Sequence, residues 1–563
     1  MITPPRLQRR DLQFYLVYAL LLILLATLRP LALPDEGRYG DVGRWMLRSG
    51  DWLTPRIDGL PFFHKPPLLY WCEAALMGVL GPHPWVARLV PAAHAWLLVL
   101  VTQLYTLRFH GHALARRVAL MLASSMLVLG GGDYINCDML VACWIAICIL
   151  CFAWALQARG RETHRLGRYG FLAAALGLLA KGLIGIALPG LVLLIWIAME
   201  KRWRDLLRLP WVSGLVIALS LGLPWFILLE RAYGGFFHYF FIEQQFSRYV
   251  GSSFNNRQPL PFYVLCLALG FFPFSTLLRW KMADASAELR SDLRLAWIWL
   301  LTILIFFSIP VSKLVGYILP VMPALALLAA VAWPRASGER STRVLYLLGA
   351  LIWALAAFAV TLALPGMPVV AWPLRLLSAL LGLLWLAGPL LHRRGHGQAL
   401  LRLWALQSVL TLFVVAALLA TRVDDKGSSL LAAALLQKPA HEQLIAYGVL
   451  PFDLPFYLDR RSAIPILGDW RARERMVKDD GDQQLIDGLP FDPAAAWVLA
   501  ERSSLAQWAA RWPRAWLVST AGARDPLLSA CAQAVGRYGE YALWQIKAAA
   551  DQADCRTSAA VPR

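Results

Sequence analysis

The sequence predicts an all-α polytopic membrane protein with a small soluble α/β domain at its C-terminal end. Of its 563 residues, 59% are hydrophobic and only 16% are charged, whereas soluble domains carry about 25% charged residues. Apolar runs recur at the roughly 20-residue length that crosses a bilayer as a helix. Beyond residue 421 the pattern changes to short strand-like runs broken by Pro, Gly and Asp. We therefore expect a transmembrane domain over 1–421 and an α/β domain over 422–563.

Thirteen membrane spans are expected within the first domain. They cover 12–33, 85–109, 113–131, 138–157, 168–181, 182–199, 210–230, 260–279, 293–311, 314–333, 343–364, 369–391 and 400–421. The N-terminal "RLQRR" and six alternate loops are basic, as the positive-inside rule requires of cytoplasmic segments. This alternation places the opposite loops and the C-terminal domain outside the cytoplasm.

The net charge of +19 does not indicate a nucleic-acid-binding protein, because the basic residues lie in short clusters between apolar segments. The eight Cys form no metal-binding motif. Cys143, Cys148 and Cys151 lie in an apolar run and are interpreted as core residues. Cys531 and Cys555 fall in the polar C-terminal region, where pairing is open from the sequence. No Gly-rich nucleotide-binding loop is present.

The expected topology gathers polar residues at the outer membrane edge. They are Asp35, Glu36, Arg38, His64, Lys65, Asp133, Asp138, Lys181, Glu243, Arg248, Lys313 and Tyr317. Each alone is compatible with a solvated or snorkelling side chain, and Asp35 and Glu36 with a helix cap and first turn. Charged side chains in a membrane cost about 2.5–3.5 kcal/mol near a helix centre. Several at one edge therefore indicate a shared cavity.

The residue types in this set suit a lipid phosphate. Lys65, Arg248 and Lys313 carry charges that bind phosphate. The carboxylates of Asp35 and Asp138 suit a general base, or the orientation of an acceptor or a metal. The residues alone thus indicate an extracytoplasmic enzyme or carrier for a lipid phosphate.

One long motif resembles a known family. The segment "PDEGRYGDVGRWMLRSGDWLTPRIDGLPFFHKPPLLYW" is similar to the bacterial aminoarabinose transferases of lipid A and their relatives in the protein mannosyltransferase superfamily. The similarity continues in "AKG" at 180–182, in residues 224–249 and in residues 306–328. The resemblance implies a C-type glycosyltransferase fold with thirteen transmembrane helices, membrane-surface helices in the first outer loop (34–84), and a soluble α/β domain.

The resemblance also implies roles for individual residues. Asp35 becomes the main catalytic or acceptor-orienting carboxylate, with Asp138 near it and Glu36 as a further catalytic candidate. The donor phosphate is held by Lys65, Arg248 and Tyr317, with Tyr39, Lys313 and Arg38 assisting. Relatives usually have Glu before Lys-Pro-Pro, where this chain has His64, and commonly Thr where it has Gly37. His64 with Glu243 or His238 is a candidate zinc site, against the alternative that His64 binds backbone or water.

The function expected from these points is transfer of a sugar from polyprenyl (undecaprenyl) phosphate to an extracytoplasmic acceptor. The favoured acceptor is lipid A, which would receive aminoarabinose at the periplasmic face of a bacterial inner membrane. The alternatives are a transferase of the same fold for another envelope glycan, lipid or protein, and a transporter or flippase for lipid-linked sugars. A transporter typically has broken helices at mid-membrane and inverted repeats, and the sequence shows no repeat.

Overall fold

The structure is a computed structural model in which two compact units are defined. It describes residues 6–247, 256–278, 286–336, 368–393, 397–439, 442–473 and 481–548, with Cys555 and short pieces between 349 and 362. The first unit comprises Met1–Leu25, Pro91–Pro224 and Asn256–Leu418, and the second comprises Ala26–Val90, Trp225–Asn255 and Leu419–Arg563. The predicted domain boundary at 421/422 stays a prediction.

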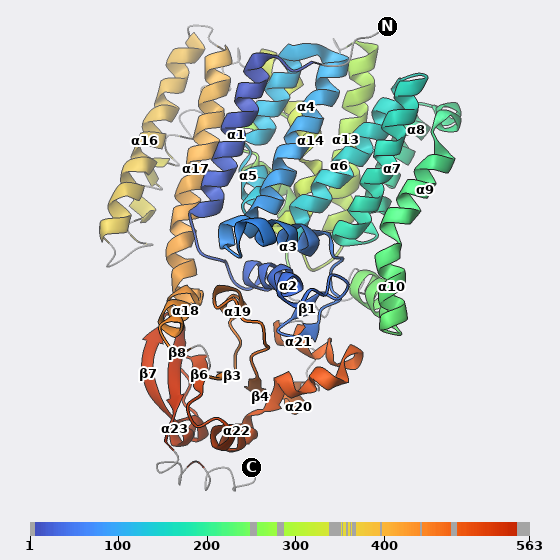
Figure 1. The fold of residues 1–563 in the computed structure, drawn as a ribbon. Coiled ribbons are helices and arrows are strands. Elements are labelled where there is room, and N and C mark those ends of the chain that lie inside the picture. The colour runs from blue at the N-terminus through green and yellow to red at the C-terminus, as the bar shows by residue number, and fades with distance from the viewer. Residues whose placement is uncertain are drawn as a thin grey trace. The chain divides into compact units, whose positions relative to one another are not determined.

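Long apolar helices build the first unit, in which α6 packs against α7 and α13 packs against α14 (Figure 1). The helices are α1 (Arg9–Thr27), α4 (Pro84–Ala123), α5 (Met126–Gly132), α6 (Cys137–Gln157), α7 (Arg161–Lys181), α8 (Ile184–Met199), α9 (Trp211–Gly222), α12 (Phe262–Gly270), α13 (Ala287–Ser308), η4 (Val315–Val321), α14 (Met322–Ala336), α16 (Pro368–Arg393) and α17 (Gly397–Lys426). Within the described residues, seven segments are long and apolar enough to span a membrane. The chain is a multi-pass membrane protein, while the count of thirteen stays a prediction.

Several helix ends differ from the sequence prediction. Within α4, Gly111 has a φ of 77° and a ψ of 175°, which are not helical. It separates the helix of the expected span 85–109 from the helix that begins the expected span 113–131. That helix ends at Ala123, and a separate helix, α5, begins after Ser125. The expected span 314–333 begins with a 3₁₀ turn, η4, before α14. Most of the expected span 343–364 lies outside the described residues.

Small residues let the helices of the first unit approach closely, as is common in membrane proteins. A Cβ at Gly177 of α7 would lie 2.9 Å from the carbonyl oxygen of Gly185 in α8. A Cβ at Gly170 would lie 2.8 Å from the ring of Phe152 in α6. Close packing of α6 against α7 brings the start of one helix beside the end of the other.

The second unit contains short helices from the first outer loop. Helix α2 (Asp35–Ser49) lies against α3 (Leu68–Leu80), and β1 (Arg56–Ile57) pairs with β2 (Leu60–Pro61) between them (Figure 1). At 13 residues, α3 is too short to span a bilayer. From residues 225–255 the unit takes α10 (Pro224–Ala232) and η2 (His238–Ser247). A Cβ at Gly37 would lie 2.7 Å from the backbone nitrogen of Asp453, so glycine allows this close approach.

A six-stranded sheet forms the C-terminal part of the second unit, as predicted for an α/β domain. Its order is β5-β4-β3-β6-β8-β7. Strands β3 (Leu444–Tyr447), β4 (Ile466–Gly468), β5 (Leu499–Glu501) and β6 (Trp516–Thr520) are parallel. Strands β7 (Ala532–Tyr538) and β8 (Tyr541–Ile546) complete it as an antiparallel hairpin.

Helices and a disulfide surround this sheet. Between and around the strands lie α18 (Ser429–Leu436), α19 (Leu454–Tyr457), α20 (Trp470–Arg473), α21 (Gly481–Ile486), α22 (Leu505–Arg511) and α23 (Pro526–Cys531). The core includes Ile445, Leu467 and Leu517. Cys531 and Cys555 form a disulfide beside it, whereas Cys143, Cys148 and Cys151 are free and buried.

Candidate active site

Two adjacent carboxylates at the start of α2 have different surroundings. Helix α2 begins at Asp35 after Pro34, so both carboxylates lie in its first turn. The side chain of the capping residue makes no hydrogen bond to the helix. Glu36 is fully buried, whereas the side chain of Asp35 is 22% exposed. Of the two, therefore, Asp35 has the surface that contact with a substrate requires.

Glu36 is held by an arginine network. Arg88 donates Nε–H to Oε1 at 3.0 Å and Nη2–H to Oε2 at 2.8 Å, and Arg29 also pairs with both oxygens. The backbone N–H of Ala32 donates to Oε2 at 2.7 Å. Burial alone would raise the pKa of Glu36, but the charges of Arg88 and Arg29 lower it to about 2. These contacts fix the loop before α2, and the catalytic role of Glu36 stays a prediction.

Asp35 pairs with Arg38 one helical turn later. The same guanidinium donates to Gln484 and lies 4.8 Å from the ring centroid of Tyr39. The Tyr39 ring is buried and packs beside Phe62 and Tyr70. Arg38 thus contacts Asp35 and Tyr39, which are close to it in the sequence, and Gln484, which the sequence did not indicate.

Lys65 and His64 lie in the loop that leads to α3. Lys65 is half-buried, directly before Pro66 and Pro67. His64 is buried, with its ring stacked on Phe62 at 4.9 Å between centroids. Its Nε2 lies 3.1 Å from Oδ2 of Asp487, which also accepts the hydroxyl of Tyr239 at 3.2 Å. Burial alone would raise the pKa of Asp487, but the hydrogen bond and charge of His64 lower this pKa below its usual range.

The candidate zinc ligands lie in different pairs. His64 faces Asp487, while Nδ1 of His238 lies 3.2 Å from Oε1 of Glu243, and the side chains of His238 and Glu243 are exposed. In the part of the chain that the structure describes, no three His, Cys, Asp or Glu side chains converge as metal ligands, and protein zinc sites typically use three or four. The described residues do not fit a zinc site, and we derive no step through a metal.

Asp138, Lys181 and Tyr317 form a second cluster, in the first unit. Asp138 lies in the first turn of α6, Lys181 ends α7, and Tyr317 lies in η4. The ammonium of Lys181 pairs with Asp138 and lies 4.0 Å from the ring centroid of Tyr317. Both charged side chains are nearly buried. A Cβ at Gly316 would overlap the carboxylate of Asp138, so glycine is needed for η4 to lie this close to α6.

Lys313 joins two loops of the first unit. Its ammonium donates to the carbonyl of Gln258 at 3.0 Å, and its backbone N–H donates to the carbonyl of Asn256 at 3.1 Å. The side chain is only 4% exposed. Arg248, the remaining phosphate-binding candidate, lies outside the described residues.

The fold and the polar clusters define a class: a multi-pass helical membrane protein that carries an α/β domain. Comparison with known proteins narrows this class further. Residues 10–240 match the family model for dolichyl-phosphate-mannose-protein mannosyltransferase. The undecaprenyl phosphate-α-4-amino-4-deoxy-L-arabinose arabinosyl transferases of Yersinia enterocolitica and Pseudomonas aeruginosa are 32% and 33% identical to this chain. Those matches cover 56% and 53% of this chain and 57% and 54% of the relatives, so the chain spans little more than half the length of either.

The fold matches that of a solved transferase over nearly its full length. The crystal structure of ArnT from Cupriavidus metallidurans bound to undecaprenyl phosphate has a TM-score of 0.81 and 25% identity, covering 98% of this chain and 99% of that one. Its apo structure gives a TM-score of 0.80. These comparisons confirm the resemblance predicted from the motifs.

Proposed function

We propose that this protein is an integral membrane glycosyltransferase that moves a sugar from polyprenyl phosphate to an extracytoplasmic acceptor. The observation that carries the proposal is the full-length match to a structure that holds undecaprenyl phosphate. The favoured reaction is aminoarabinose transfer to lipid A, the activity that the relatives' name and the resemblance suggest. The alternative is the same transfer to another envelope glycan, lipid or protein.

The proposed location is the bacterial inner membrane, with thirteen spans and a periplasmic active site. The alternation of basic loops supports this orientation. The disulfide between Cys531 and Cys555 also supports it, because disulfides persist in oxidising compartments such as the periplasm.

The proposed reaction is an inverting displacement. An acceptor oxygen attacks the anomeric carbon, and the bond from that carbon to the lipid phosphate breaks with its electron pair leaving on the phosphate. Lys65 and Arg248 stabilise the charge that develops on the leaving group. Asp35, with its exposed surface and its orientation set by Arg38, positions the acceptor and takes its proton when the acceptor is a hydroxyl.

Asp138 is proposed to act in the same reaction, with Lys181 as its positioning residue. The Lys181 ammonium compensates the buried carboxylate and fixes its direction. The cation also lies over the face of Tyr317, which orients that side chain. Lys313 is proposed to support this region by joining its two loops.

Mass spectrometry of lipid A from a deletion strain tests the favoured acceptor. We expect the aminoarabinose-modified species to disappear, to return with the wild-type gene, and not to return with Asp35→Asn or Lys65→Ala at equal protein levels. Unchanged lipid A in the deletion strain would contradict lipid A as the acceptor, and full rescue by both variants would contradict the site.

A further inference from the structure

We propose that the C-terminal α/β domain carries a second ligand site, a crevice for a small anionic saccharide such as a sugar phosphate or a sugar acid. The crevice is lined by Tyr447, Gly448, Arg502, Thr520, Ala523, Arg524, Asp525 and Pro526. Its volume is about 380 Å³, within the range of about 300–1,000 Å³ common for small-molecule sites.

The strand order explains why a crevice forms at this place. From the central strand β3 the chain moves outward to β4 and β5, then returns to place β6 on the other side of β3. The loops after β3 and β6 therefore leave the sheet in opposite directions. In open parallel sheets, ligands bind at the carboxyl ends of the strands where the order reverses in this way. Gly448 directly follows β3, and Thr520 ends β6.

Gly448 is suited to a turn at the edge of such a crevice. Its φ of 75° lies in the region that favours glycine. A Cβ at this position would come within 3.3 Å of Nη2 of Arg502. Glycine thus allows the chain to turn away from β3 while the guanidinium of Arg502 stays beside the turn.

The polar groups of the crevice are partly ordered in advance. Arg502 lies 3.2 Å from Asp469 and 3.6 Å from Asp525, and its guanidinium lies 5.4 Å from the ring centroid of Tyr447. The hydroxyl of Tyr447 donates to Oδ2 of Asp525 at 2.6 Å, while Oδ1 of Asp525 accepts the backbone N–H of Leu527. Both Asp469 and Asp525 pair with Arg502, so the positive charge of Arg502 is already compensated.

Arg524 supplies the charge that selects an anion. It is exposed and lines the crevice, and no carboxylate among the described residues lies within ion-pair distance of it. A guanidinium suits the planar, bidentate recognition of phosphate or carboxylate. Asp525 and the hydroxyls of Tyr447 and Thr520 suit the several hydroxyl groups of a sugar. Together they favour a saccharide with one anionic group.

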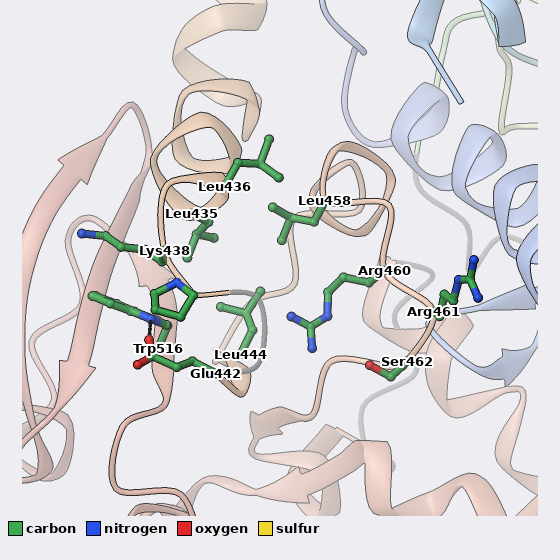
Figure 2. Close-up of a pocket in the computed structure, with 11 residues that line it drawn as sticks. Leu435, Leu436, Lys438, Glu442, Leu444, Leu458, Arg460, Arg461, Ser462 and Trp516 are labelled. Carbon is green, nitrogen blue, oxygen red and sulfur yellow. Dashed lines mark hydrogen bonds between the residues drawn. The ribbon is translucent and has the colours of Figure 1, made fainter. Parts of the chain in front are cut away.

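A cavity at the amino ends of the same strands fits this role less well. It is lined by Leu444 of β3, Trp516 of β6 and Arg460, among others. Figure 2 shows Arg460 extending into it, while Arg461 and Lys438 extend away in different directions. Glu442 already accepts the indole N–H of Trp516. With a single inward cation among leucines, it lacks the convergent donors and acceptors of the crevice.

Binding of simple sugars to the purified full-length protein tests this proposal without a lipid donor. Glucose 1-phosphate and glucuronate are titrated by calorimetry, with glucose and inorganic phosphate as comparison probes. We expect at least one charged sugar to bind saturably, and glucose and phosphate to bind at least about tenfold more weakly. We expect R524E to weaken the charged sugar by about tenfold or more, a change of about 1.4 kcal/mol.

The matched control is R537E, on an exposed arginine of β7 whose side chain donates to the carbonyl of Gly539. It should bind as the wild type does. R524K, which keeps the charge but loses the bidentate geometry, should bind the charged sugar more weakly than the wild type and more tightly than R524E. The proposal is overturned when neither charged sugar binds saturably, when R524E and R537E behave alike, or when glucose or phosphate binds as tightly. K65A should keep this binding while losing transfer, which separates this site from the proposed reaction.

Discussion

At the residue scale, the adjacent carboxylates of "PDEGRY" are expected to have separate tasks. Glu36 is buried between two arginines, and Asp35 keeps an exposed surface beside Arg38. Removing one partner of a buried ion pair costs about 3–5 kcal/mol, because the other charge stays buried and uncompensated.

Glu36→Gln should therefore lower the free energy of unfolding by about 3–5 kcal/mol. Asp35→Asn should change stability by less than about 1 kcal/mol, as for other partly exposed pairs, while abolishing transfer. Thermal unfolding in detergent and a transfer assay, run on both variants, compare these effects. Equal stability of the two variants would contradict the separation of tasks.

Asp58 should make stability depend on pH. It lies in the tight turn between β1 and β2, is 1% exposed, and accepts the N–H of Ile464 at 2.8 Å. Burial, with the charge of Asp41, raises its pKa to about 8 from an ordinary 3.8. The folded state therefore keeps a proton that the unfolded state releases. The stabilisation is complete below about pH 4 and is lost as the pH rises through 8.

Asp58→Asn keeps an oxygen for Ile464 and removes this titration. The wild type should lose stability relative to the variant between pH 5 and 8, by up to about 1.4 kcal/mol per pH unit. Melting temperatures of both proteins across this range measure the difference. Parallel pH profiles would show that Asp58 does not titrate in this way.

At the scale of elements, the ends of α6 and α7 and the turn η4 depend on the Lys181–Asp138 pair. Lys181→Met leaves a nearly buried carboxylate without its cation and should cost about 3–5 kcal/mol. Adding Asp138→Asn to Lys181→Met should recover part of that stability, because no buried charge then remains. Lys201→Met, in the turn after α8, is the control. Additive losses in the double variant would contradict direct pairing.

The disulfide should stabilise the end of the C-terminal sheet. Cys531 ends α23 and is bonded to Cys555, 24 residues later. Replacing both by serine should lower the free energy of unfolding of this part by roughly 2–5 kcal/mol. Limited proteolysis and thiol labelling of the unreduced wild type and the variant measure this. Reactive thiols in the untreated wild type would show that the bond is absent.

Sequence patterns predicted the presence of the helices better than they predicted the ends of the helices or the contacts between residues distant in the sequence. Membrane-length apolar runs follow from local hydropathy, so α6 and α17 overlap the whole of the expected spans 138–157 and 400–421. Helices α7 and α13 begin several residues before the spans expected for them. The end of α4 at Ala123 and the start of a separate helix, α5, after Ser125 depend on local backbone geometry that hydropathy does not report. Asp487 and Gln484 could not be assigned to the site, because they lie 423 and 446 residues from His64 and Arg38. Lys181 did give a signal, a lone cation between apolar runs.

At the scale of the whole molecule, the alternation of basic loops predicts an orientation in the membrane. Residues 422–563 should lie in the periplasm together with the loop that carries Asp35 and Lys65. Cysteine labelling in intact cells, with single cysteines placed at Ser503 and at Arg204, should label the first and spare the second. The reverse pattern would place the proposed site on the cytoplasmic side, where this chemistry is not expected.

Transfer by the reconstituted protein measures the proposed reaction itself. Purified wild-type protein in liposomes is given undecaprenyl phosphate-linked aminoarabinose and lipid A, and both lipids are followed by mass spectrometry. We expect the wild type to form modified lipid A and free undecaprenyl phosphate in equal amounts, and we expect no product from Asp35→Asn or Lys65→Ala. This proposal is contradicted when the wild type releases no polyprenyl phosphate with lipid A or any other envelope acceptor, or when both variants turn over at the wild-type rate.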